Sequence, residues 1–248
     1  MPDVVDRKSE KASSSPGWLL SLIHRRFLLL FLFLLATLAL YPFAENSPSA
    51  YIAFRFAGSA VILFSVYAIG FRRSLVILGL MLAVPRLVQH FLALRANAGA
   101  LALLSILLSF AFDLFIIIVM FRRVFSFKDK PTAETIFGAL CIYLLVGFSF
   151  ASVYEMLATL QPGAFYLDPA TNTHFIPNRF DFIFYSFGTM TALGASGIAP
   201  VSNQARALTI IQSMLGIFYL AILISRLMAA YRAHLLEEKA HLLEERRE

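Results

Sequence analysis

Charged residues are scarce in this chain. Asp, Glu, Lys and Arg make up 15% of its 248 residues, whereas 59% of the residues are hydrophobic. Soluble proteins average about 25% charged residues, and so little charge cannot cover a soluble surface. The composition therefore excludes the soluble classes and predicts an integral membrane protein that crosses the bilayer several times.

Cysteine is nearly absent, because Cys141 is the only one and lies within an apolar run. A disulfide framework and a cysteine metal site are therefore excluded. The histidines are scattered, and the sequence holds no His-x-x-x-His pair, Gly-x-Ser-x-Gly elbow or paired intramembrane aspartates. We expect no catalytic residues, no metal site and no cofactor, which disfavours an enzyme. A secondary transporter is disfavoured too, because it would need an internal repeat with two broken helices.

The positive net charge has a membrane explanation. The formal charge is +6, but the basic residues gather at the ends of apolar runs, where they fix orientation and contact anionic headgroups. This pattern places both termini on the cytoplasmic side of the cell (inner) membrane. We expect membrane lipids, and no nucleic acid, among the partners.

Long apolar runs are abundant. Six of them approach the roughly 20 residues that a helix needs to cross a bilayer, and a seventh, 180–190, is too short to cross and should be re-entrant. The predicted fold class is all-α integral membrane, with six transmembrane helices and one re-entrant helix. The six runs are 27–43, 52–70, 75–94, 100–121, 133–158 and 204–230.

The loop after the short run is rich in Thr, Gly and Ser, and it covers residues 189–200. It lies between two segments that belong in a membrane. Irregular backbone at that depth survives only where it lines a water-filled path or is buried in protein. A loop of this kind between two apolar helices is the layout of an ion-conducting pore.

Residues 132–230 resemble the pore domain of potassium channels, in particular short prokaryotic ones. The stretch 138–147 is similar to the outer helix of that family, and Phe182–Phe187 is similar to its pore helix. The segments 205–208 and 219–227 are similar to the start and end of its inner helix. The resemblance implies a homotetramer, in which backbone carbonyls from four loops replace the hydration shell of a monovalent cation, K⁺ or Na⁺.

The family pattern T-x-T-T-V-G-Y-G-D-x-x-P aligns with Thr189–Pro200 without gaps. Four positions depart from it: Ala192 replaces a threonine, Ala195 the tyrosine behind the filter, Ser196 the second glycine, and Gly197 the aspartate that anchors the outer mouth. We expect fewer ordered carbonyl rings and weakened potassium selectivity. A differently folded filter, and a non-conducting sensory or regulatory protein that keeps the fold, remain open. The predicted filter residues are Thr191, Ala192, Leu193, Gly194, Ala195, Ser196 and Gly197.

The segment 128–132 divides the chain, and the last residues carry a short repeat. His234-Leu-Leu-Glu-Glu recurs from His241, which leaves a short coiled coil and a solvated amphipathic helix end open. The predicted parts are a cytoplasmic N-terminal tail (1–26), a four-helix transmembrane module (27–127), a pore domain (128–232) and a cytoplasmic amphipathic helix (233–248).

The first four spans do not form a conventional voltage sensor, since 100–121 contains no arginine or lysine. Two charges lie unusually deep, Arg86 in the third span and Asp113 in the fourth. Because a lone charge at mid-bilayer is costly, we expect the two to pair. The pair would lock two helices together or act as a sensing element.

Three further residues are assigned to the pore. Gly216 lies midway along the last span, where a glycine serves as a gating hinge in the resembling family or allows close helix packing. Glu155 and Asp181 are predicted near the outer mouth, where acids from four copies could concentrate cations. For Asp181 we favour the alternative, which is capping of the helix that it begins.

Overall fold

The computed structural model describes residues 26–44, 48–69, 73–92, 100–125, 133–172, 175–194 and 197–245. The predicted N-terminal tail falls outside this part of the chain, apart from Arg26. Within the described ranges the chain forms seven helices and two short strands. The helices are α2 (Arg26–Ala44), α3 (Pro48–Ile69), α4 (Arg73–Leu92), α5 (Ala100–Val124), α6 (Ala133–Leu160), α7 (Arg179–Met190) and α8 (Asn203–Glu245), and the strands are β1 (Phe165–Leu167) and β2 (Ile198–Pro200).

The helices follow the apolar runs of the sequence. Three described helices contain stretches long and apolar enough to cross a membrane, namely Arg26–Phe43, Glu134–Leu160 and Asn203–Ala229. Shorter apolar helical stretches lie at Ile52–Tyr67 and Leu75–Pro85. The mostly helical chain therefore fits the predicted all-α membrane fold, and the count of six spans stays a prediction.

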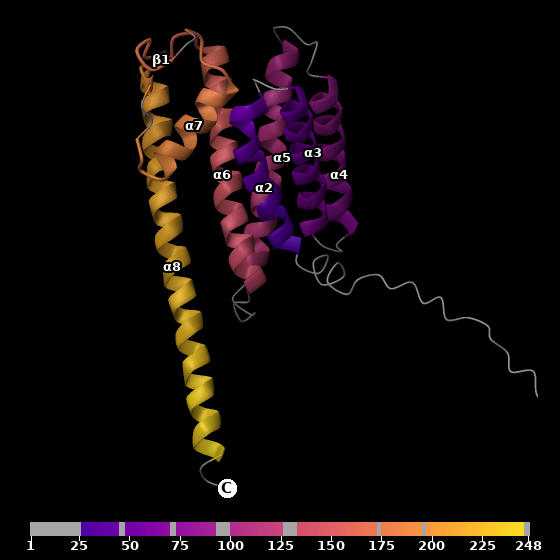
Figure 1. The fold of residues 1–248 in the computed structure, drawn as a ribbon, viewed down its shortest axis with the longest axis vertical. Coiled ribbons are helices and arrows are strands. Elements are labelled where there is room, and N and C mark those ends of the chain that lie inside the picture. Colours follow the sequence, from indigo (N-terminus) through magenta and orange to yellow (C-terminus); the bar gives the residue numbers. More distant parts are fainter. Residues whose placement is uncertain are drawn as a thin grey trace, which may run out of the picture.

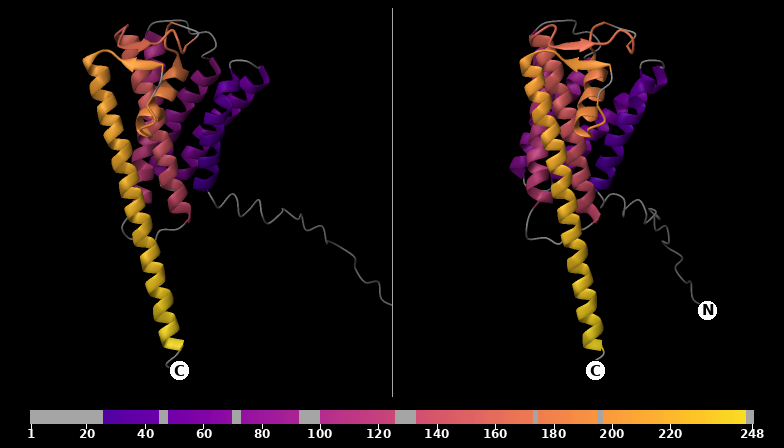
Figure 2. Two further views of the ribbon diagram at one scale, coloured as in Figure 1. Left: turned by 60° about the vertical axis from the view of Figure 1, so that its left-hand side comes forward. Right: turned by 90° about the vertical axis from the view of Figure 1, so that its left-hand side faces the viewer.

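Helices α2 to α6 stand side by side in one bundle, and α8 runs along its edge (Figure 1). The short helix α7 lies obliquely between α6 and α8, near the end of the bundle where α8 begins. The far part of α8 extends well beyond the bundle (Figure 2). This helix runs unbroken through the predicted boundary at 232–233, because no glycine or proline interrupts the chain there.

A two-stranded antiparallel sheet closes the chain around α7. Strand β1 precedes α7 and β2 follows it, and Phe165 pairs with Pro200 while Leu167 pairs with Ile198. The chain therefore approaches and leaves α7 at the same end of the bundle. This is the geometry of a re-entrant segment. The sequence analysis expected no strands: β1 was not predicted, and β2 lies within the loop 189–200 that was expected to be irregular. Each strand is only three residues long.

Helix α6 is the centre of the packing. One hydrophobic core joins it to α2 and α5, and a second joins it to β1 and α7. In the second core the rings of Tyr154, Phe165 and Tyr185 meet edge to face at centroid distances of 5.0 to 5.6 Å. The main buried side chains of the first core are Leu30, Leu34, Phe112, Ile116, Ile142 and Leu145.

Candidate ion-conduction site

Helix α7 starts with a capping box. The Asn178 Oδ1 atom accepts hydrogen bonds from the backbone N–H groups of Phe180 (2.7 Å) and Asp181 (3.2 Å). In return the Asp181 carboxylate accepts the Asn178 backbone N–H at 2.7 Å. These bonds satisfy donors that a helix start leaves unpaired. The structure therefore gives Asp181 the capping role.

Glu155 lies beside a positive charge. Its carboxylate is 2.9 Å from Arg179 Nη1, at the first residue of α7. Both side chains are partly exposed, so the pair contributes at most about 1 kcal/mol. The two charges cancel, and Glu155 does not present an isolated negative charge at this end of the bundle.

A buried polar network fastens α7 to both of its neighbours. Gln212 of α8 is fully buried, and its amide donates to the Ser186 hydroxyl (2.6 Å) and to the Ser186 carbonyl (3.1 Å). The Gln212 carbonyl oxygen accepts from the Tyr154 hydroxyl of α6 at 2.6 Å. Ser186 in turn donates to the Gly147 carbonyl of α6 at 2.7 Å. Three helices are thus joined through one satisfied set of buried hydrogen bonds.

Two more contacts extend this interface along α8. We call the contact line of α8 with α7 the seam. One turn before Gln212, the Tyr185 and Thr209 hydroxyl oxygens lie 2.6 Å apart. One turn after it, Gly216 is buried against the last turn of α7, where a β-carbon would lie 2.5 Å from the Met190 carbonyl oxygen. A side chain at Gly216 would therefore push α7 and α8 apart. The structure shows the close packing that a glycine permits, and the hinge stays a prediction.

The sequence analysis missed Gln212. The available signal was a single amide within the apolar stretch 207–224. Such a side chain is costly to bury without partners, so its partners must be close. Nothing in the sequence identified Ser186 and Tyr154 as those partners, because they lie on other helices.

The loop after α7 starts with a left-handed turn. Thr191 ends the helix, Ala192 has φ 58° and Gly194 has φ 76°. The Ala192 N–H returns to the Thr189 carbonyl (3.3 Å) and the Gly194 N–H to the Gly188 carbonyl (3.3 Å). A positive φ costs a residue with a side chain about 1 kcal/mol, so Ala192 holds a conformation that glycine would adopt more easily.

All four residues from Thr191 to Gly194 are exposed in the single chain, and Leu193 exposes 75% of its surface. Thr191 turns its hydroxyl back to the Phe187 carbonyl at 2.7 Å. Ala195 and Ser196 lie outside the described residues. The expected effect of these two replacements, fewer ordered carbonyl rings, therefore stays a prediction.

Of the predicted intramembrane charge pair, the structure describes the side chain of Asp113 only. Asp113 is buried, with 2% of its surface exposed, on α5. Arg86 lies on α4, which packs against α5, but its side chain is not among the described parts of the structure. The pairing therefore stays a prediction.

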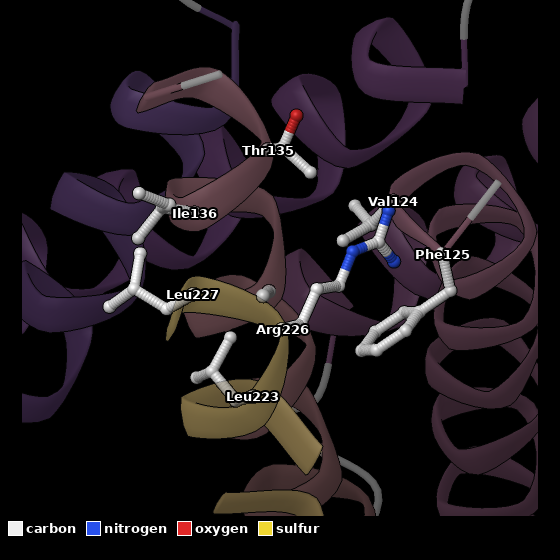
Figure 3. A pocket seen from close by; sticks show the side chains of 8 residues that line it. Val124, Phe125, Thr135, Ile136, Leu223, Arg226 and Leu227 are labelled. Carbon is white, nitrogen blue, oxygen red and sulfur yellow. The ribbon is translucent and has the colours of Figure 1, made fainter. Parts of the chain in front are cut away.

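A small apolar cleft lies between α5, α6 and α8 (Figure 3). Across it the Arg226 guanidinium lies 4.9 Å from the centroid of the Phe125 ring. The contact connects the end of the four-helix module with the part of α8 beyond Gly216. The cleft is lined by Val124, Phe125, Thr135, Ile136, Ala139, Leu223, Arg226 and Leu227.

The fold, together with α7 and the loop that follows it, defines a helical membrane protein. Its re-entrant helix and loop lie between two long apolar helices. Among the described residues, no three His, Cys, Asp or Glu side chains lie close enough to hold a metal ion. Residues 134–233, which cover α6, α7 and most of α8, match the family model described as "Ion channel". This match supports an ion channel, and it points to a transporter-type protein that is not an enzyme. Comparisons with curated proteins and with solved structures gave no match.

Proposed function

We propose that the chain forms a homotetrameric cation channel of potassium-channel architecture, with the loop after α7 on the central axis. The observation that carries this proposal is the exposure of Thr191–Gly194 beside α8. A re-entrant segment at membrane depth cannot leave its backbone groups facing lipid. A ring of copies would turn the same groups toward a shared water-filled path.

The bare surface of α8 supports the same assembly. Only 11% of the residues in Asn203–Ala229 are buried within the chain. Lipid could cover an apolar helix, but α8 also flanks the exposed loop. Placing further copies against α8 covers both features at once, in a closed symmetric ring.

The proposed permeant ion is a monovalent cation, K⁺ or Na⁺, with weakened preference for K⁺. Ala192 lacks the hydroxyl that a threonine would offer an ion.

Membrane lipids surround the tetramer in the cell (inner) membrane, with both termini in the cytoplasm. The β1 and β2 end then faces outside.

The second candidate is a non-conducting membrane protein that keeps the pore fold. The observation that favours it is the number of departures from the filter pattern, including Ala192 at positive φ. It would give the same tetramer with no ion flux.

The test is reconstitution of the purified full-length protein in liposomes that hold a potassium gradient. We expect the gradient to dissipate, with a permeability ratio of K⁺ over Na⁺ well below that of a strictly selective pore. A well-folded tetramer without any flux would contradict the first candidate and favour the second. A monomer would contradict both.

Two glycines provide a matched pair of variants. Gly194 in the loop and Gly163 before β1 both have positive φ, and a β-carbon added to either would meet open space. Alanine at either position costs about 1 kcal/mol, or about fivefold in the equilibrium constant that favours the native backbone. Gly194→Ala should lower the flux by up to about that factor, and Gly163→Ala should leave it unchanged. Equal flux in both variants would place the conduction path elsewhere.

A further inference from the structure

The segment between α6 and α7 holds the outer end of the loop. We name residues 161–172 the turret. The Gly197 carbonyl, at the start of the chain leaving the loop, accepts two hydrogen bonds from the turret. One comes from the Asp168 backbone N–H at 2.9 Å, and the other from the Asn172 side-chain amide at 2.7 Å. The loop is thus fastened from outside its own sequence.

The turret is folded so that both donors reach one oxygen. Its last turn closes on Asp168, whose carbonyl accepts the N–H groups of Thr171 (3.2 Å) and Asn172 (3.1 Å). The Asp168 carboxylate accepts the Ala170 N–H at 3.0 Å. The Asn172 amide also donates to the Asp168 carbonyl at 2.9 Å. Asn172 therefore bridges the turret turn and the Gly197 carbonyl.

The turret also fills the space beside Gly197. This glycine has φ 96°, and a β-carbon on it would lie 2.7 Å from Thr171 Oγ1 and 2.9 Å from Asn172 Nδ2. In the alignment with the potassium-channel pattern, an aspartate stands at this position. Here a side chain would displace the ends of Thr171 and Asn172, which occupy this space.

We propose that Asn172 is a positioning residue of the pore, whose amide holds the outer end of the filter by the Gly197 carbonyl. It performs from the turret the anchoring that the pattern assigns to an aspartate within the filter. The inference rests on the proposed function, because it concerns the shape of the same conduction path. Ion preference should then depend on a residue that lies outside the filter sequence.

The experiment compares Asn172→Ala with Asn203→Ala in the full-length protein. Asn203 is a matched control, since it is an exposed amide at the first residue of α8. Asn172→Asp is the second variant, because it keeps the size of the side chain and removes the donor. Size-exclusion chromatography first verifies the tetramer in each variant.

Two readouts follow. Amide hydrogen exchange of a peptide covering 164–172 reports the turret contact without any need for conduction. We expect exchange at Asp168 to rise about fivefold in both Asn172 variants, which corresponds to about 1 kcal/mol for one hydrogen bond. The permeability ratio of K⁺ over Na⁺ in liposomes should shift by a similar factor. Asn203→Ala should change neither readout.

The outcomes separate the two proposals. Unchanged exchange in the Asn172 variants would overturn the contact itself. Faster exchange with an unaltered permeability ratio, or loss of the tetramer in both variants, would overturn the positioning role and leave a structural one. A wild-type protein that conducts no ion would refute the proposed function, and the positioning role with it, while the exchange data would still show whether Asn172 fastens the loop.

Discussion

Helices α6 and α8 each contain a 27-residue stretch that could cross a membrane, Glu134–Leu160 and Asn203–Ala229, and the two have equal hydropathy. Their surroundings differ. In the first stretch 56% of the residues are buried within the chain, and in the second 11%. Helix α6 is covered by α2, α5 and α7, whereas α8 contacts its own chain mainly along the seam with α7, against α6 and around Arg226.

This difference teaches that the packing of the chain is centred on α6, whereas most of α8 in Asn203–Ala229 is not covered by its own chain. The buried residues of α8 include Ala205, Gln212 and Gly216, and these lie along the face turned to α7. Elsewhere in Asn203–Ala229 the helix exposes large apolar side chains, among them Ile210, Phe218 and Ile222. A helix with such a face is stable in the membrane, and under the proposed function further copies of the chain would cover both this face and the exposed loop.

The largest expected effect compares two isoleucines. Ile142 of α6 is 1% exposed, and Ile222 of α8 is 55% exposed. Ile142→Ala should reduce the free energy of unfolding of the chain by about 2–5 kcal/mol, the usual cost of a cavity in a core. Ile222→Ala should leave the chain stable and weaken the tetramer instead. Thermal unfolding in detergent and native mass spectrometry would measure the two effects, and equal loss of chain stability would break the comparison.

A smaller effect is expected at the seam. Gln212→Leu removes the acceptor of the Tyr154 hydroxyl and the donor to Ser186, and should reduce stability by about 1–3 kcal/mol. Gln204→Leu is the control, because Gln204 is exposed on the same helix. The thermal midpoint of each variant would be compared with wild type. If the two variants lose the same stability, the buried network does not fasten α7.

The smallest effect concerns the exposed end of α6. Glu155→Gln removes the pair with Arg179 and should change stability by less than about 1 kcal/mol. Because the pair carries no net charge, we expect little change in single-channel conductance. At low salt the conductance should decrease slightly, because the positive charge of Arg179 is then no longer neutralised. A large fall at low salt that disappears at high salt would show that Glu155 concentrates cations, as the sequence suggested.

Much of the fold was predictable because it depends on local composition. The run 27–43 became α2, the run 133–158 became α6, and the short run 180–190 became α7. Apolar runs must form helices in a bilayer, since their backbone groups can find partners only within the segment. The loop was also predictable from its glycines. In the structure Gly194 and Gly197 adopt the positive φ values that glycine favours.

Contacts between distant segments were not predictable. The sequence placed Glu155 at the outer mouth without its partner Arg179, whereas the capping role of Asp181, a local contact, was among its predictions. Gln212 was overlooked, and so was the bond from Asn172 to the Gly197 carbonyl. The contacts of Glu155, Gln212 and Asn172 with these partners join residues 24 or more positions apart in the chain, and no periodic pattern encodes such distances.

By itself the sequence determined that this chain belongs in a membrane, where its helices lie, and that an irregular glycine-containing loop follows a helix too short to cross. These properties are set by hydropathy and by the backbone freedom of single residues. Only the tertiary structure decided that α6 is enclosed while α8 is bare, that Gln212 ties α7 to its neighbours, and that the turret holds Gly197. The physical reason is that equal apolar helices pack differently according to the polar and small residues that they bring face to face.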